Sequence, residues 1–466
     1  MTLKQDCTNS YLNFAKAYRD LLKRELDLEE FPQETFDTEV FTEKGTENKT
    51  VTRIRVYTIF DVDDEKILEL EETKACSALH TEQGVLPLPS MSDNDGNRIE
   101  DPSPKQIAWS QLFSFLRWPF FEVIRTAETL NFADEQITSI YDQYFEHWTA
   151  VERKYKTRFP LLDFESELDE IELGEDTTIS FLSNDEKTQV YKRSASRPGP
   201  FRDGLNEWDL IGCSHEGVWE YSVPHGEEKP KPQKGIYAVI TTLRLFKEGS
   251  VGIRSQLTRP DPDLQHVVSS EPHPLGEMYP AGLHNKFVLL ENDRRPICDL
   301  FASVSSFLSL PRRSNLGLAL HRFNLSYERR GFEDKLLDLV ISLECVLLPG
   351  DRAELKHRLA LRASFFLKNY WEPQNTYALM DLMYQVRSNI VHGGKTLEDQ
   401  LDEGGFQRKA SAITEVENVS SREFYLHCES RCRTLLREIL LKSEEQQDLK
   451  EMMISADQSI LENISN

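Results

Sequence analysis

The sequence predicts an α+β multidomain protein, in which a mixed α/β N-terminal half precedes a C-terminal all-α helical bundle. Its 466 residues exceed what one ordinary hydrophobic core accommodates. Strand-like runs alternate with proline-rich connections in the middle of the chain, and apolar residues recur at helical spacing from about residue 301 onward. We therefore expect a mixed α/β region at 1–157, a β-rich or mixed region at 158–310, the bundle at 311–445 and a polar tail at 446–466.

The N-terminal region begins with an amphipathic pattern at residues 9–26, which predicts a first helix. Residues 49–60 then alternate imperfectly between apolar and polar side chains, which predicts a strand. Prolines and an Asn-Asp-Gly turn make residues 84–106 a loop or linker. The first helix is expected at residues 9–26, with an apolar side made of Leu12, Phe14, Ala15, Tyr18, Leu21 and Leu22.

Two further helices are expected at residues 106–130 and 133–155. The first should be kinked or split at Trp118-Pro119, because proline lacks the backbone N–H that an interior helical position uses. Short strand-like runs follow between residues 161 and 190. The apolar run at 235–246 fits either a buried strand or a short helix, because it lacks a polar side.

The C-terminal half reads as helices joined by short connections. An acidic, glycine-containing loop is expected at residues 397–408. Five helices of these lengths predict an α bundle; they are expected at 314–327, 332–347, 354–368, 377–391 and 421–442.

Composition limits the classes of function. No apolar run approaches the roughly 18 residues of a membrane span, and the N-terminus lacks the apolar core of a signal peptide. Scattered cysteines favour a reduced, cytoplasmic setting. A net charge of −24 argues against a surface that binds nucleic acid everywhere, so positive charge would have to be local. Basic clusters at 311–313, 327–330 and 356–362 are candidates, although a solvated helix face is the favoured explanation for any one of them.

The candidate site is an arginine and a histidine at the end of the fourth predicted helix. Arg387 and His392 enclose the polar pair Ser388-Asn389, and Gly393-Gly394 follow at a point where a helix cap uses positive φ. On a regular helix the two residues lie roughly 140° apart, so they converge only if the helix ends there or a second chain contributes. The same five-residue offset joins Arg352 to His357 and Arg422 to His427.

Arginine and histidine together suit phosphodiester chemistry without a metal. A guanidinium binds phosphate oxygens with two parallel hydrogen bonds, and an imidazole exchanges protons near neutral pH. The structural alternative is an Arg387 paired with an acidic neighbour and a His392 that caps its own helix.

Other constellations predict neither a metal nor a cofactor. Cys213, His215 and the histidines at 225, 266 and 273 lack the paired spacing of a metal site, and Cys428 and Cys432 fit an apolar helix face. The run Gly393 to Thr396 ends like a phosphate-binding loop, but Asn389 stands where that motif needs glycine.

Three runs resemble the ApeA-like HEPN domain family: residues 336–344, 354–360 and 387–394. Residues 171–174 and 242–249 resemble the region that precedes this domain in similar proteins. The resemblance is good over about 311–442, looser back to about 158, and absent from residues 1–157.

The resemblance implies an HEPN-type bundle that cleaves RNA in antiviral defence without metal or cofactor, with Arg387 and His392 catalytic. It implies substrate contacts from Ser388, Asn389 and Lys395, and a homodimer through the bundle that brings two motifs to one RNA. The N-terminal half would be a sensor or substrate selector, with a phage component or a protein as trigger. Some HEPN domains only dimerise or bind nucleotides or proteins, which is the alternative.

Overall fold

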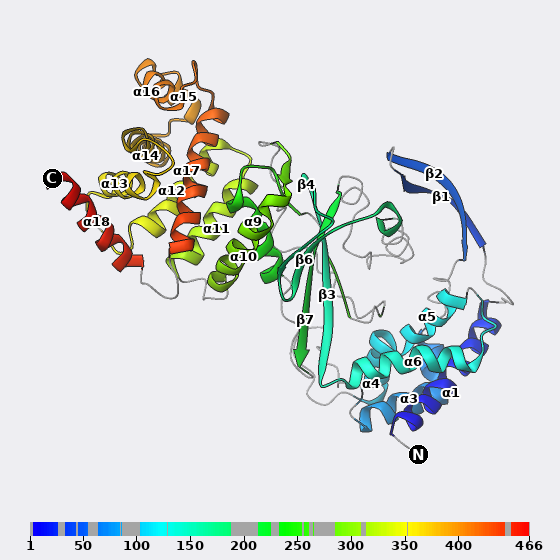
Figure 1. Cartoon of the computed structure of the whole chain (residues 1–466). Coiled ribbons are helices and arrows are strands. Elements are labelled where there is room, and N and C mark those ends of the chain that lie inside the picture. Colours follow the sequence, from blue (N-terminus) through cyan, green and yellow to red (C-terminus); the bar gives the residue numbers. More distant parts are fainter. Residues whose placement is uncertain are drawn as a thin grey trace.

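The protein contains N-terminal helices, a central antiparallel sheet and a helical C-terminal half. The N-terminal helices and the C-terminal helices lie at opposite ends of the molecule, with the sheet between them (Figure 1). The predicted mixed α/β class is confirmed at this level. The structure is a computed structural model that describes residues 3–26, 33–42, 45–54, 64–83, 85, 103–127, 129–187, 213–224, 233–253, 256–260, 264, 285–308, 314–351, 353–442 and 449–465.

The N-terminal helices share one apolar core. Phe14, Ala15, Tyr18, Leu21 and Leu22 are all buried, as the amphipathic pattern predicts, and Leu12 packs against them half-buried. The hairpin formed by β1 (Gln33–Thr42) and β2 (Gly45–Ile54) includes part of the predicted strand at 49–60, and residues 55–60 lie outside the described part. The helices are α1 (Leu3–Leu26), α2 (Asp64–Glu69), α3 (Glu71–Glu82), α4 (Pro104–Gln111), α5 (Arg117–Ala127) and α6 (Asp134–Thr149).

The helix predicted at 106–130 is split, but earlier than expected. A π turn, η2 (Leu112–Leu116), separates α4 from α5. In an unbroken α-helix the ring of Pro119 would meet the carbonyl of Phe115, four residues before it. The wider π turn contains Phe115 and lets the chain continue as a helix.

The central sheet is antiparallel throughout, in the order β5-β6-β7-β3-β8. Its longest pairing joins β3 and β7, from Glu152↔Pro224 to Leu161↔His215. The helix predicted at 133–155 is therefore too long, because its last residues form the start of β3. A separate parallel pair joins β4 (Phe164–Ser166) to β9 (Phe287–Leu289). The sheet strands are β3 (Glu152–Leu161), β5 (Glu170–Gly174), β6 (Thr177–Phe181), β7 (His215–Pro224) and β8 (Leu257–Pro260).

The ambiguous apolar run at 235–246 is a helix, α9 (Gln233–Phe246). Ile236, Val239, Ile240 and Leu243 have no exposed surface, so the helix is buried on most of its sides and shows no polar face. One continuous cluster of buried apolar side chains joins the sheet, α9, α10 (Arg294–Leu308) and the C-terminal helices.

All five helices predicted for the bundle are present. The expected loop at 397–408 is wrong, because this range contains all of α15 (Leu397–Leu401) and the start of α16 (Gly404–Thr414). A reciprocal cap begins α15: the Thr396 hydroxyl accepts a hydrogen bond from the Asp399 N–H at 3.0 Å, and the Asp399 carboxylate accepts one from the Thr396 N–H at 2.9 Å. The five helices are α11 (Asn315–Glu328), α12 (Phe332–Leu347), α13 (Leu355–Leu367), α14 (Pro373–Ser388) and α17 (Ser421–Lys442).

The predicted polar tail is also wrong. Residues Leu449–Ser465 form α18, and Met452, Met453 and Ala456 join the bundle core. These apolar residues occupy one face of the helix, although the segment as a whole is polar. Its composition alone therefore does not predict that it packs against the bundle. None of the helices in the described part of the chain is long and apolar enough to cross a membrane.

Candidate functional site

The candidate motif lies where α14 changes its winding. α14 ends at Ser388, a π turn η5 (Asn389–Gly393) follows, and Gly394 closes it with φ of +63°. The predicted glycine cap is thus Gly394, and Gly393 belongs to the turn. Hydrogen bonds from residue i to i+5 put more residues into a π turn than into an α turn, so His392 is rotated less far from Arg387 than on a regular helix. π turns of this kind occur frequently at functional sites.

Arg387 is half-buried and has no polar partner among the described residues. Its Cζ lies 5.8 Å from the centre of the Tyr384 ring, and its buried Nε makes no hydrogen bond. Arg322 and Arg431 also bury an unpaired Nε, but each makes a hydrogen bond through Nη1, to Asp338 at 2.9 Å and to the His427 carbonyl at 3.2 Å. No acidic side chain in the described part of the chain forms an ion pair with Arg387, as the structural alternative would require.

His392 is exposed and likewise makes no hydrogen bond or ion pair with the described residues. The matched histidines differ. His357 Nδ1 lies 2.9 Å from the Tyr377 hydroxyl, and His427 Nδ1 lies 3.3 Å from Arg431 Nη1. Burial, followed by the positive charge of Arg431, lowers the pKa of His427. Arg352, the third arginine with this spacing, lies outside the described residues.

The three predicted substrate contacts have different surroundings. Ser388 is half-buried at the end of α14. Asn389 donates a hydrogen bond from Nδ2 to Gln400 Oε1 at 2.8 Å, which ties the π turn to α15 and leaves its Oδ1 available. Lys395 is exposed, but its Nζ lies 2.5 Å from Glu403 Oε1, so its charge is locally balanced.

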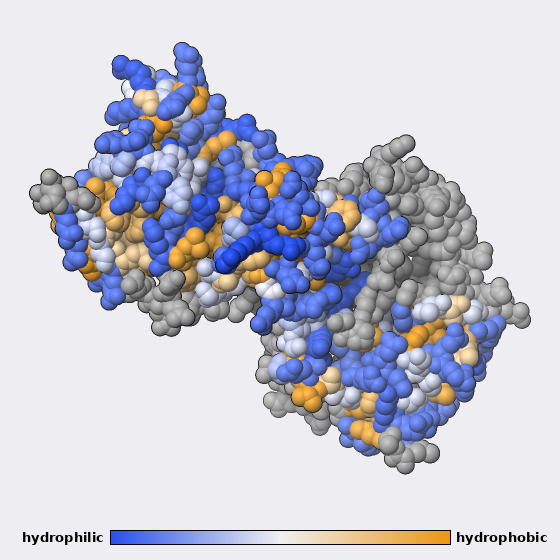
Figure 2. All heavy atoms as spheres, viewed as in Figure 1, coloured by the Kyte–Doolittle hydropathy of each residue, from blue (hydrophilic) through white to orange (hydrophobic). Residues whose placement is uncertain are grey.

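The predicted basic clusters are largely neutralised. Arg358 pairs with Asp351, and Arg362 pairs with Asp351 and Asp457. In the 327–330 cluster Arg329 pairs with Asp338, and residues 311–313 lie outside the described part. Mostly hydrophilic residues cover the end of the bundle that contains α15 and α16 (Figure 2). A nucleic acid would meet acidic side chains there, because α15 and the residues just after it carry Glu398, Asp399 and Asp402, all exposed.

Two residues beside the motif were not predicted from the sequence. Tyr384 lies one turn before Arg387, a spacing that the sequence displays. Glu344 lies on α12, and only the packing of α12 against α14 brings its charge to Tyr384.

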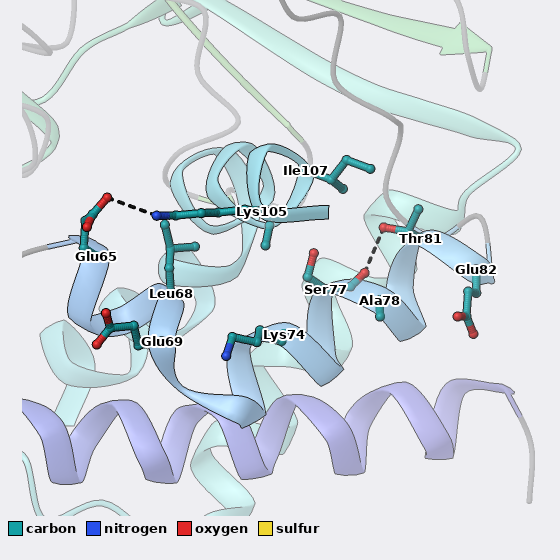
Figure 3. Close-up of a pocket in the computed structure, with 11 residues that line it drawn as sticks. Glu65, Leu68, Glu69, Lys74, Ser77, Ala78, Thr81, Glu82, Lys105 and Ile107 are labelled. Carbon is teal, nitrogen blue, oxygen red and sulfur yellow. Dashed lines mark hydrogen bonds and ion pairs between the residues drawn. The ribbon is translucent and has the colours of Figure 1, made fainter. Parts of the chain in front are cut away.

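A cavity of about 590 Å³ lies far from this motif, among the N-terminal helices (Figure 3). Its apolar lining includes Leu68, Ala78 and Ile107, and a Glu65–Lys105 ion pair of 3.2 Å lies at its edge. Because the N-terminal helices and the bundle occupy opposite ends of the molecule (Figure 1), the cavity and the Arg387 motif are separate features.

The histidines and cysteines considered as ligands have structural surroundings where they are described. His215 lies within hydrogen-bonding distance of the Ser214 hydroxyl and the Leu168 carbonyl, and Cys428 and Cys432 are fully buried. Histidines 225, 266 and 273 lie outside the described part. Within that part, no group of three or more histidine, cysteine, aspartate or glutamate side chains is arranged to hold a metal ion.

Comparison of the chain with models of protein families, with curated proteins and with solved structures finds no match. The candidate site therefore rests on its own geometry: a half-buried arginine on an aromatic ring, followed by an exposed histidine, both without polar partners among the described residues.

Proposed function

We propose that the chain is a metal-independent endoribonuclease of the HEPN type, with Arg387 and His392 as catalytic residues. One observation carries the proposal. Arg387 and His392 lack polar partners in the described part of the chain, whereas His357 and His427, which have the same offset from an arginine, are engaged. Since the guanidinium of Arg387 makes no hydrogen bond or ion pair with the described residues, its Nη donors can bind a phosphate without giving up a protein partner.

The proposed reaction is an attack of the RNA 2′-oxygen on the adjacent phosphorus. A histidine removes the 2′-hydroxyl proton, the bond between phosphorus and the 5′-oxygen breaks, and a protonated histidine gives its proton to that oxygen. The products are a 2′,3′-cyclic phosphate and a 5′-hydroxyl. Arg387 would bind the non-bridging phosphate oxygens and stabilise the charge that develops on them.

Two histidine roles and one motif per chain favour a homodimer through the bundle. His392 of one copy would act as base and His392 of the other as acid, with RNA between them. Ser388, the free Oδ1 of Asn389 and Lys395 would contact the substrate. By resemblance alone, we further propose a cytoplasmic role in antiviral defence, with the N-terminal half as sensor or substrate selector and a phage component or a protein as trigger.

The test is cleavage of a fluorophore- and quencher-labelled RNA by the purified full-length chain, with and without EDTA. We expect cleavage that EDTA leaves unchanged, and products with cyclic phosphate ends. Cleavage that EDTA abolishes and Mg²⁺ restores would contradict the mechanism.

A non-catalytic interaction module is the second candidate. It is favoured by Val391, which is 50% exposed in the π turn beside His392, and by the pairing of Lys395 with Glu403. In that case the parent protein cleaves no RNA, and substitutions in the turn alter self-association instead.

A further inference from the structure

The aromatic ring beneath Arg387 is a feature that the proposed chemistry leaves unexplained. Tyr384 precedes Arg387 by three residues on α14, so the two side chains extend over the same face of the helix. The Arg387 Cζ lies 5.8 Å from the ring centre, within the range of a cation–π contact. A guanidinium resting on a ring keeps its N–H groups directed outward in its own plane, so the contact restrains the group without using its donors.

Charges of both signs act on the hydroxyl of Tyr384. Burial raises the pKa of Tyr384, the negative charge of Glu344 on α12 raises it further, and the positive charge of Arg387 lowers it. The phenol therefore stays protonated at neutral pH. Glu344 lies on α12, which packs against α14.

Only part of the Arg387 side chain is buried. Arg387 Nε is enclosed by protein and has no hydrogen-bond partner, so the Nη groups are the donors left for a ligand. An arginine has about 2 kcal/mol of side-chain entropy to lose on ordering, and a restrained arginine loses less of it on binding.

We propose that Tyr384 is the positioning residue of the site: its ring holds the Arg387 guanidinium ready for an RNA phosphate. This inference rests on the proposed function. Tyr384 itself neither touches the reacting atoms nor exchanges a proton in this scheme.

The experiment compares Tyr384→Leu, which removes the aromatic face, with Tyr384→Phe, which keeps it. Tyr377→Leu is the control, because Tyr377 lies on the same helix but contacts His357. Each change is made in the parent and in Arg387→Gln. The readouts are kcat and KM for RNA cleavage, affinity for 2′-O-methyl RNA, which lacks the attacking hydroxyl, and the unfolding midpoint. Tyr384→Met replaces Tyr384→Leu if the latter fails to fold.

We expect Tyr384→Leu to lower kcat/KM about tenfold, which lies within the range of one cation–π contact. Tyr384→Phe should stay within about threefold of the parent, because it keeps the cation–π contact. In the Arg387→Gln background Tyr384→Leu should have no further effect, either on cleavage or on RNA affinity.

Three results would overturn the inference. Equal losses from Tyr384→Leu in both backgrounds would mean a general structural role. A loss from Tyr384→Phe as large as that from Tyr384→Leu would assign the role to the hydroxyl. A parent protein that neither cleaves RNA nor binds 2′-O-methyl RNA would refute the proposed function and, with it, the positioning role. If the parent cleaves RNA but the effects of Tyr384→Leu and Arg387→Gln are additive, the positioning role alone is refuted.

Discussion

Arg362 on α13 holds Asp457 on α18 with two parallel hydrogen bonds, from Nε to Oδ1 at 2.8 Å and from Nη2 to Oδ2 at 2.7 Å. The guanidinium is 3% exposed and also pairs with Asp351, so it binds carboxylates from two sides. This geometry is the strongest form of arginine–carboxylate contact. It explains why a sequence that reads as a polar tail is an ordered part of the bundle.

Asp457→Ala should lower the free energy of unfolding by about 1–2 kcal/mol, within the range of charge-assisted hydrogen bonds but reduced because Asp457 is 36% exposed. The measurement is urea unfolding followed by circular dichroism at pH 7. Glu451→Ala, at an exposed position of the same helix, is the control and should change little. An equal change in the free energy of unfolding from both substitutions would show that the Arg362–Asp457 pair does not stabilise the protein.

Lys335 predicts a dependence of stability on pH. It is fully buried and donates hydrogen bonds to the carbonyls of Ser326 and Tyr327, at 2.9 and 3.3 Å, in the last turn of α11. Burial, and then the positive charge of Arg244, lower its pKa to about 8. Between that value and about 10.4 in the unfolded chain, the unfolded state binds the extra proton, so this group makes stability rise with pH.

The parent should therefore gain stability relative to Lys335→Met by about 1.4 kcal/mol per pH unit from pH 8 to 10. Urea unfolding of both proteins at pH 7, 8, 9 and 10 measures this difference. Lys409→Met, at an exposed position, serves as the control for the removal of one lysine charge. A pH-independent difference for Lys335→Met would contradict the prediction.

Arg387→Ala and His392→Ala should each reduce RNA cleavage by at least about a hundredfold, the usual loss when a charge-stabilising group or a general acid/base is removed. Both side chains lie away from the buried Leu379, Met383 and Val386, so the unfolding midpoint should not change.

The controls are His357→Ala and His427→Ala, whose imidazoles already have partners in Tyr377 and Arg431. They should retain most of the activity. Equal loss in all four variants, with unchanged midpoints, would mean that a different pair of residues carries out the reaction.

The proposed homodimer predicts a light-scattering mass of twice one chain at micromolar concentration. Val391 is 50% exposed beside His392 and would be covered if two motifs face each other, so Val391→Asp should shift the protein toward monomer. Leu461→Asp is the matched control, because Leu461 is 64% exposed on α18. A monomeric parent with full cleavage activity would refute the dimer.

Local periodicity predicts the elements whose apolar and polar sides differ. α1 and the five long bundle helices follow from spacing alone, because a helix that covers a core must repeat apolar residues every three to four positions. Periodicity does not decide whether α9 is a helix or a strand, because a segment buried on most sides has no polar face to indicate its period. It misses α15, where a capping pair outweighs the adjacent glycines. It also misses α18, whose few apolar residues are buried only when the helix packs against α12 and α13.

The candidate site divides in the same way. The sequence by itself determines the spacing of Arg387 and His392, the presence of a glycine cap at Gly393-Gly394 and the position of Tyr384 one turn earlier. Only the tertiary structure decides that the turn winds as a π turn, that Glu344 comes to Tyr384 from α12, and that His357 meets Tyr377 from another helix. The physical reason is that a side chain's partners depend on which distant segments pack beside it. The five-residue offset between arginine and histidine occurs three times in this chain, and the offset alone does not predict that packing.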